Sequence, residues 1–281
     1  MINVLIAGGD MRQVYCARRL DEKYSVSVTG FDSDNVPVKL KKANINQTFS
    51  CAVLPVPSLD ERGMINTPCY SGEISPDDVK EMLSPDAVIF AGKVTDELRE
   101  IFSGHEVYDY MEREELSLRN AVPTAEGAVQ IALEELPVTL SGLKVLIVGM
   151  GRIGTSLAEI LKGFGADVTA AVRNAKGAAK AGLIGIKAVY TEKMPSDFGL
   201  VFNTVPSMIF GREQLSRFGE DTLFIDLASK PGGIDFSSAQ ELGRKVIWAL
   251  GLPGKTAPVT SGEIIAETID NMLSERGTDD V

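Results

Sequence analysis

Histidine and cysteine are scarce in this 281-residue chain, and each scarcity excludes a kind of chemistry. The single histidine, His105, lies in the run Ser-Gly-His-Glu, which is typical of a surface turn, so no histidine-based proton relay is predicted. A general acid or base would instead be a carboxylate, a lysine, a tyrosine or a held water. The three cysteines, Cys16, Cys51 and Cys69, contain no C-x-x-C pair and predict no metal site. Their small, odd number fits a reducing cytoplasm.

Positive charge and long apolar runs are also in short supply. The chain has 28 Lys and Arg against 39 Asp and Glu, a net charge of −11, which argues against nucleic acids and anionic membrane surfaces as partners. No apolar run approaches the roughly 20 residues that a membrane span needs. A small anionic ligand is still compatible with this charge, because a few local cations can dominate the potential in a cleft. We therefore expect a cytoplasmic protein with a small-molecule ligand.

Short apolar runs recur along the whole chain and alternate with helical patterns. Five predicted strands in the first half cover residues 4–7, 25–31, 51–54, 87–91 and 107–108. Six in the second half cover residues 144–148, 168–172, 188–190, 200–204, 223–227 and 246–249. Strands that alternate with helices indicate parallel sheets covered on both faces, and six strands is the number of a full dinucleotide-binding sheet. The predicted fold class is α/β with two domains, an N-terminal flavodoxin-like parallel sheet and a C-terminal Rossmann domain, with a cleft between them.

The domain boundaries are predicted from two helical segments. A helix over 124–136, between Pro123 and Pro137, is expected at the junction. We assign residues 1–120 to an N-terminal substrate and catalytic domain and residues 121–261 to the Rossmann domain. An amphipathic helix from about Gly262 to Arg276 follows the sixth strand and is free to cross back, so 262–278 is assigned to the first domain.

The strongest motif is a G-x-G-x-x-G run that follows a five-residue apolar strand and opens a helix. Its first glycine permits the tight turn, its second lets a pyrophosphate approach the backbone, and its third allows close packing of helix and strand. The pyrophosphate would lie on the free N–H groups of the helix N-terminus. The residues predicted to contact the dinucleotide here are Gly149, Gly151, Arg152, Ile153 and Gly154.

The choice of dinucleotide is predicted from the end of the next strand. An NAD site usually has an acidic residue there, but Asp167 lies at the start of that strand. Arg173 and Asn174 stand at its end, with Lys176 close by. A guanidinium can bind a 2′-phosphate through two parallel hydrogen bonds, whereas a carboxylate would repel it. We therefore predict NADP rather than NAD as the cofactor.

Loops rich in Gly and Pro follow the last three predicted strands, over 203–207, 226–233 and 251–258. Ligands of open parallel sheets bind at the carboxyl ends of the strands, and such loops allow close backbone approach to a nicotinamide ribose. The alternative is ordinary turn chemistry. The further cofactor contacts predicted from these loops are Asn203, Thr204, Val205, Pro206, Leu227, Ala228, Gly251, Leu252 and Pro253.

The catalytic and substrate-binding candidates are charged or polar residues close to these loops or at the strand ends of the first domain. The run Gly8-Gly9-Asp10 lacks a third glycine, so it predicts no second dinucleotide but suits a carboxylate. The predicted substrate-binding residues are Gly9, Asp10, Arg12, Ser58 and Thr124. The predicted catalytic residues are the carboxylates Glu126 and Asp226 and the cations Lys93 and Lys230. The alternatives are capping or loop ordering for the carboxylates and a solvated surface for the cations.

Several segments together resemble the family of dipicolinate synthase A subunits, over nearly the whole chain. They are Gly8-Gly9-Asp10 with Arg12, Leu54-Pro55-Val56, Pro123-Thr124 with Glu126-Gly127, Gly149 to Gly154, Asn203 to Met208, Asp226 to Gly233, and Gly251-Leu252-Pro253-Gly254 with Ala257-Pro258. The loop 226–233 and the Gly-Leu-Pro-Gly run are more specific than any Rossmann motif. The chain departs from the family at Lys230, where Arg is common, and at Leu250, where Pro is common.

The resemblance implies a reaction and a setting. The family uses NADP and acts on a hydroxylated tetrahydrodipicolinate, a cyclic dicarboxylate from the diaminopimelate branch of lysine synthesis. Loss of water and hydride transfer to NADP+ would give dipicolinate, the pyridine dicarboxylate of bacterial spores. The family works with a second, flavoprotein-like B subunit in the mother-cell cytoplasm during sporulation. A homo-oligomer is also expected.

Two other functions are compatible with the same residues. The chain could be a catalytically silent NAD(P)-binding protein that supports the B subunit, since it shows no histidine-based dyad. It could also be another two-domain dehydrogenase of amino or hydroxy acids. The absence of a late histidine and the arginine at the second strand's end count against that last alternative.

Overall fold

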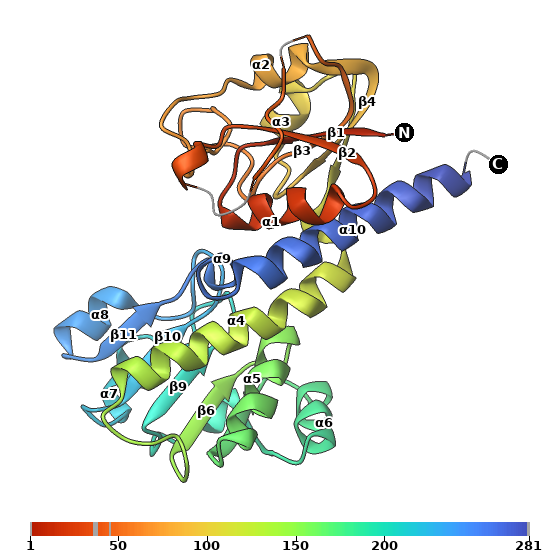
Figure 1. The fold of residues 1–281 in the computed structure, drawn as a ribbon. Helices are drawn as coiled ribbons and strands as arrows, with labels where there is room; N and C mark the ends of the chain where they lie inside the picture. Colours follow the sequence, from red (N-terminus) through yellow and green to blue (C-terminus); the bar gives the residue numbers. More distant parts are fainter. Residues whose placement is uncertain (1, 36–38, 45, 280–281) are drawn as a thin grey trace. The chain divides into compact units, whose positions relative to one another are not determined.

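The computed structural model describes residues 2–35, 39–44 and 46–279. The chain divides into two compact units (Figure 1). Unit 1 comprises Met1–Asn120 together with Ala257–Val281, and unit 2 comprises Ala121–Thr256. Each unit has its own sheet and its own buried core.

Unit 1 contains a five-stranded parallel sheet in the order β2-β1-β3-β4-β5. This order is flavodoxin-like, and its topological switch point lies between β1 and β3. The strands are β1 (Asn3–Ala7), β2 (Ser25–Thr29), β3 (Phe49–Val53), β4 (Leu83–Ala91) and β5 (Glu106–Asp109). The helices and 3-10 turns are α1 (Met11–Leu20), η1 (Ser33–Asn35), α2 (Pro76–Glu81), α3 (Asp96–Ile101), η2 (Tyr110–Glu112) and α10 (Pro258–Asp279).

Helix α10 packs against α1, although the two are almost 250 residues apart in the sequence (Figure 1). The buried face of α10 carries Ile265 and Ile269, which join the core of unit 1. Gly262 makes the approach of the two helices possible, because a Cβ there would lie 2.4 Å from the Arg12 carbonyl oxygen. Asp270 of α10 accepts a hydrogen bond from Lys23, just beyond α1.

Unit 2 contains a six-stranded parallel sheet in the order β11-β10-β9-β6-β7-β8. Two parallel α/β sheets confirm the predicted fold class, and the second has the strand arrangement of a doubly wound Rossmann sheet. The strands are β6 (Lys144–Val148), β7 (Asp167–Val172), β8 (Lys187–Tyr190), β9 (Leu200–Asn203), β10 (Leu223–Asp226) and β11 (Lys245–Trp248). The helices are α5 (Arg152–Gly163), α6 (Ala175–Leu183), η3 (Thr191–Lys193), α7 (Arg212–Arg217), α8 (Phe236–Glu241) and α9 (Leu252–Thr256).

Helix α4 (Glu114–Glu135) differs from the predicted helix over 124–136. Pro123 was expected to precede the helix, but it lies inside it and is buried. An internal proline removes one helical hydrogen bond and costs about 3 kcal/mol. Burial of Ala125, Ala128 and Ala132 in the unit 2 core compensates, so the helix continues through the proline.

The C-terminal boundary also differs from the prediction. The last helix begins at Pro258 rather than near Gly262, and unit 1 resumes at Ala257 rather than after residue 261. Proline is well suited to a first helical position, where its missing N–H is not needed. The sequence pattern missed this turn because its residues, Pro-Val-Thr-Ser, have no apolar spacing.

Candidate functional site

The glycine motif of unit 2 has the geometry of a pyrophosphate-binding turn. Gly149 has a left-handed φ of +96°, and a Cβ there would lie 2.5 Å from the Thr204 hydroxyl oxygen. A Cβ on Gly154 would lie 2.0 Å from the Gly149 carbonyl oxygen, so only glycine lets α5 pack this closely. Gly151 precedes α5, makes no side-chain cap, and has open space where a Cβ would stand. Open space beside an uncapped helix N-terminus is what a pyrophosphate needs.

A pocket of about 620 Å³ opens beside this turn, entirely within unit 2. It is lined by Val148, Gly149, Met150, Ala171, Val172, Arg173, Asn174, Lys176, Gly177, Lys180, Thr191, Glu192, Val205, Pro206, Ser207 and Ile209. Of the predicted cofactor residues it therefore includes Gly149, Arg173, Asn174, Val205 and Pro206. The other predicted cofactor residues do not line it.

The end of β7 gives this pocket a cationic wall. Arg173, Lys176 and Lys180 line it, against the single carboxylate of Glu192. Within the described part of the chain, Arg173 and Lys176 form no ion pair. Asn174 has a local task, since its side-chain oxygen accepts a hydrogen bond from Gly177 N–H at 3.0 Å and caps α6.

Asp226 and Asn203 order the loops that follow β9 and β10. They are register partners on neighbouring strands, and both are fully buried. Asn203 Nδ2 donates to Asp226 Oδ1 at 2.8 Å, and the other carboxylate oxygen accepts Gly233 N–H at 2.8 Å. The Ala228 N–H donates to Oδ1 at 3.1 Å. This geometry favours loop ordering, one of the two alternatives for Asp226, over proton transfer.

The remaining predicted residues of unit 2 lie in three places. Leu227 and Ala228 directly follow β10 in the chain and are buried. The Ala228 carbonyl accepts a hydrogen bond from Trp248 Nε1 at 2.9 Å. Lys230 is exposed in the same loop. Gly251 has a φ of +69° and precedes α9, which contains Leu252 and Pro253. Thr124 and Glu126 lie on α4 within unit 2, and Glu126 is exposed.

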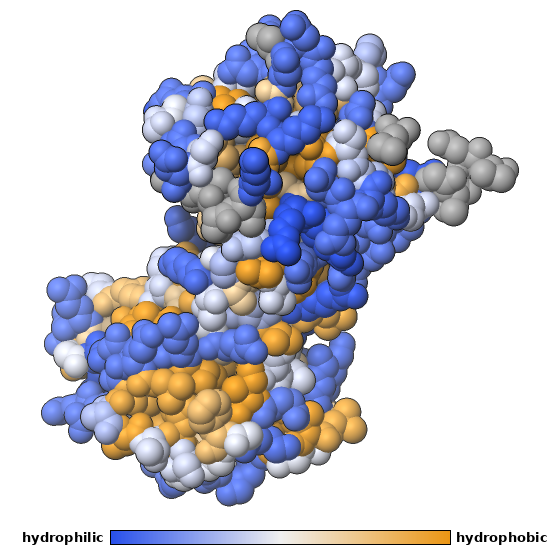
Figure 2. All heavy atoms as spheres, in the orientation of Figure 1, coloured by the Kyte–Doolittle hydropathy of each residue, from blue (hydrophilic) through white to orange (hydrophobic). Residues whose placement is uncertain are grey.

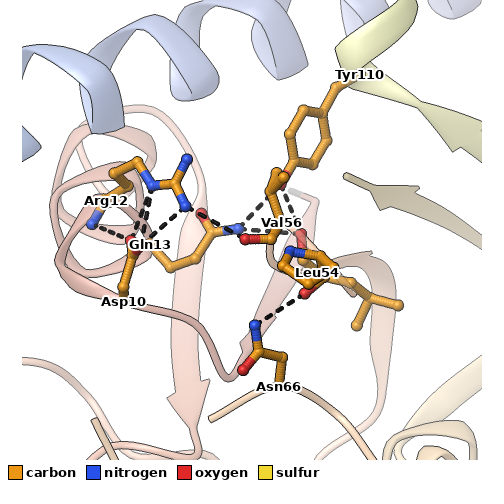
Figure 3. Close-up of polar contacts among 8 residues, drawn as sticks. Asp10, Arg12, Gln13, Leu54, Val56, Asn66 and Tyr110 are labelled. Carbon is orange, nitrogen blue, oxygen red and sulfur yellow. Dashed lines mark hydrogen bonds and ion pairs between the residues drawn. The ribbon is translucent and has the colours of Figure 1, made fainter. Parts of the chain in front are cut away.

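Asp10 and Arg12, two of the predicted substrate residues, lie at the β1/β3 switch point of unit 1 (Figure 3). Gly8 and Gly9 turn with φ values of +69° and +108°. Asp10 then caps α1 by accepting the Arg12 N–H at 2.9 Å. The Arg12 guanidinium donates to both Asp10 oxygens and to the Val56 carbonyl oxygen at 3.2 Å. Asp10 thus neutralises much of the charge that was predicted to bind substrate.

Gln13 and Tyr110 complete this edge, and neither was predicted from the sequence. Gln13 Nε2 donates to the Leu54 carbonyl at 3.0 Å and to the Tyr110 hydroxyl oxygen at 3.2 Å. Tyr110 donates to the same carbonyl at 2.9 Å. Burial raises the pKa of Tyr110 far above its ordinary value, so its phenol stays neutral. The one available signal was a glutamine on the apolar face of a helix pattern, which does not identify partners 41 and 97 residues away.

Ser58 and Lys93 lie at the neighbouring loops after β3 and β4. Ser58 is buried, and its hydroxyl lies 3.1 Å from the Pro55 carbonyl oxygen and 3.0 Å from that of Gly92. This hydroxyl therefore ties two loops together. Lys93 is exposed and lines a pocket of about 200 Å³. His105 approaches the Ala87 carbonyl through Nδ1 at 3.2 Å, in the turn before β5.

None of the described helices is long and apolar enough to cross a membrane. Within the described ranges of the chain, no group of three or more His, Cys, Asp or Glu is arranged to hold a metal ion.

Known proteins resemble this chain in both halves. Residues 3–111 match the family model for the N-terminal domain of the dipicolinate synthase A subunit. Residues 119–230 match the model described as "D-isomer specific 2-hydroxyacid dehydrogenase, NAD binding domain". The dipicolinate synthase A subunit of Bacillus subtilis (strain 168) is 31% identical, over 98% of this chain and 96% of that protein.

Two crystal structures show the same arrangement of elements. The dipicolinate synthase A subunit from Bacillus halodurans has a TM-score of 0.88 and 28% identity, with 97% of each chain covered. The corresponding structure from Bacillus subtilis has a TM-score of 0.87 and 30% identity, with 99% of this chain and 97% of that chain covered.

Proposed function

Because this chain belongs to the family of dipicolinate synthase A subunits and contains a nicotinamide-dinucleotide-binding domain, we propose that it is the NADP-dependent oxidoreductase component of such a synthase. The observation that carries the proposal is the full-length likeness to the Bacillus subtilis A subunit. The reaction would be the conversion of a hydroxy-tetrahydrodipicolinate, from the diaminopimelate branch of lysine synthesis, to dipicolinate during sporulation.

The proposed reaction has two steps, a dehydration and an oxidation. The substrate first loses its ring hydroxyl and a neighbouring proton as water, which leaves a dihydropyridine dicarboxylate. This ring then loses a hydride and a proton and becomes aromatic. When bound, NADP+ accepts the hydride and becomes NADPH. The proton of the second step passes to a base or to solvent.

The cationic wall of the unit 2 pocket supports NADP over NAD. Arg173 and Lys176 would hold the 2′-phosphate, because both lack an ion-pair partner among the described residues. The turn from Gly149 to Gly154 would hold the pyrophosphate at the start of α5.

The proposed contacts of the substrate dicarboxylate are cations at the strand ends, Arg12 and Lys93 in unit 1 and Lys230 in unit 2. Lys93 and Lys230 are exposed. The Arg12 guanidinium already donates to Asp10 and to the Val56 carbonyl, so only its remaining N–H groups could bind the substrate. Gly9 and Thr124 stay proposed substrate contacts. Glu126, or a held water, is the proposed acid for the departing hydroxyl, since the oxygens of Asp226 are engaged by protein donors.

The proposed partners are a flavoprotein-like B subunit and further copies of this chain, in the mother-cell cytoplasm. The Bacillus subtilis relative is named as one lettered component of a synthase, which supports a second component. Figure 2 shows an apolar area on unit 2, and exposed apolar area supports self-association.

One assay tests the proposed function. The purified chain is mixed with NADP+ and freshly prepared hydroxy-tetrahydrodipicolinate, with and without the B subunit, and NADPH and dipicolinate are measured. Equal amounts of both products from the chain alone are expected. Tight NADP+ binding with product only in the mixture that contains the B subunit would favour the silent cofactor-binding protein. Turnover of a simple 2-hydroxy acid instead would favour another two-domain dehydrogenase.

A further inference from the structure

Lys93 has an unusual backbone for a residue with a side chain. Among the residues that the structure describes, it is the non-glycine residue with a left-handed φ, at +63°. It lies just beyond β4, at the carboxyl edge of the unit 1 sheet. A Cβ is disfavoured in this conformation, where glycine is readily accepted. Strained residues of this kind persist only where the surrounding structure holds them, and they cluster at functional sites.

Asp109 is the group that holds Lys93 in this conformation. Its Oδ1 accepts the Lys93 N–H at 3.2 Å, and its Oδ2 accepts the Val94 N–H at 2.7 Å. These two N–H groups belong to the peptides on either side of the Lys93 Cα, so one carboxylate fixes both backbone angles of Lys93. Consecutive N–H groups that converge in this way form a nest for an anion. Asp109 also accepts the Met111 N–H at 2.8 Å, which anchors the carboxylate to the end of β5.

The turn around Lys93 is also fixed from its other side. A Cβ on Gly92 would lie 2.0 Å from Val56 Cγ2, so the turn is wedged against the loop after β3. Ser58 contacts the Gly92 carbonyl from the same loop at 3.0 Å. Both Lys93 and Ser58 line the pocket of about 200 Å³, together with the carboxylates Asp60 and Glu97. Arg62 pairs with Asp60 at 3.0 Å, so that carboxylate is already engaged.

We propose that Asp109 is a positioning residue, which holds Lys93 in its left-handed conformation and thereby keeps the lysine ammonium on the wall of this pocket for a substrate carboxylate. The proposal rests on the proposed function, because it assigns Lys93 to the anionic substrate of that reaction. Glycine would relieve the strain at position 93 but would remove the ammonium. A functional side chain would therefore explain why lysine, and not glycine, stands at position 93.

A double-mutant cycle with Asp109→Asn and Lys93→Gly tests this coupling. Asparagine offers one side-chain oxygen, so it cannot accept the Lys93 and Val94 N–H groups on separate oxygens. We expect Asp109→Asn to lower kcat/KM about tenfold to a hundredfold, with no change in NADP+ affinity. In the Lys93→Gly background, which has already lost the ammonium, Asp109→Asn should cause no further loss. Lys93→Arg, which keeps the cation, should retain more turnover than Lys93→Gly.

The wild type, Asp109→Asn, Lys93→Gly and the double variant are also compared by thermal unfolding. Asp109→Asn should lower the unfolding temperature less in the Lys93→Gly background than in the wild-type background. Glycine adopts the left-handed conformation without the hydrogen bonds that Asp109 accepts. Equal losses of kcat/KM and of unfolding temperature in both backgrounds would overturn the proposal, because Asp109 would then act independently of Lys93. If the wild-type chain shows no turnover, the proposed function fails, and the unfolding temperatures still decide whether Asp109 holds Lys93.

Discussion

At the scale of single residues, Arg173 is the cation that most directly tests the choice of dinucleotide. Replacement of Arg173 by Ala should weaken NADP+ binding by about tenfold to a hundredfold, the value of one or two charge-assisted hydrogen bonds. NAD+ binding should change little, because NAD+ has no 2′-phosphate. Calorimetric titration with both dinucleotides measures this. Lys187→Ala removes an exposed cation that does not line the pocket and serves as the control.

If Arg173→Ala weakens both dinucleotides equally, the 2′-phosphate does not lie on this side chain. The preference for NADP would then have to come from Lys176 or Lys180, which line the same wall.

Asp226 provides a second prediction at this scale. Asp226→Asn replaces an acceptor of buried N–H groups by an amide that can accept on one oxygen only. We expect the free energy of unfolding to fall by about 1–3 kcal/mol, the cost of a buried unsatisfied group. Urea unfolding without cofactor measures this. Asp221→Asn, at an exposed carboxylate just before β10, should leave stability unchanged. Similar stability for the two variants would contradict the loop-ordering role.

At the scale of elements, the close packing of α1 and α10 depends on Gly262. Gly262→Ala would place a methyl group 2.4 Å from the Arg12 carbonyl oxygen and 2.8 Å from Tyr15 Cβ. Such overpacking costs about 1–3 kcal/mol, so the unfolding temperature should fall. The same substitution at Gly182 in α6 meets no atom within 4 Å and should instead stabilise by up to about 1 kcal/mol. A rise in unfolding temperature for both variants would show that α10 does not pack this closely.

The elements were largely predictable from the sequence because most signals are local. Apolar runs predicted the strands of both sheets, and the glycine motif predicted the turn from β6 to α5. The helix across Pro123 was not predictable in this way, since tertiary burial of Ala125 and Ala128 overrides the local signal of proline.

The site was predictable in part for the same reason. Arg173 was identified by its position at the end of a strand, and it does line the pocket. Asp226 and Asn203 were both singled out, but their hydrogen bond joins residues 23 apart and no local pattern reveals it. The contacts of Gln13 and Asp109 likewise depend on which loops the sheet brings together.

At the scale of the whole molecule, the division into two units predicts where NADP+ acts on stability. The ligand should slow amide exchange most in unit 2, around residues 149–154 and 172–177, because these form the turn and the cationic wall. At a concentration about 100-fold above its dissociation constant, it should add about 2.7 kcal/mol to the unfolding free energy of the unit that binds it. Hydrogen exchange read by mass spectrometry measures both effects. Protection confined to unit 1 would contradict the assignment.

The proposed function depends on one step, the transfer of a hydride from the cyclic dicarboxylate to NADP+. The decisive experiment is a single turnover with substrate deuterated at two ring positions, the saturated carbon bonded to nitrogen and the methylene next to it, because the second step removes a hydride from one of these carbons and a proton from the other. We expect deuterium to be recovered on the nicotinamide ring of NADPH, in an amount equal to the dipicolinate formed. Dipicolinate formed with all of the lost deuterium released to solvent, and none on the cofactor, would contradict this step.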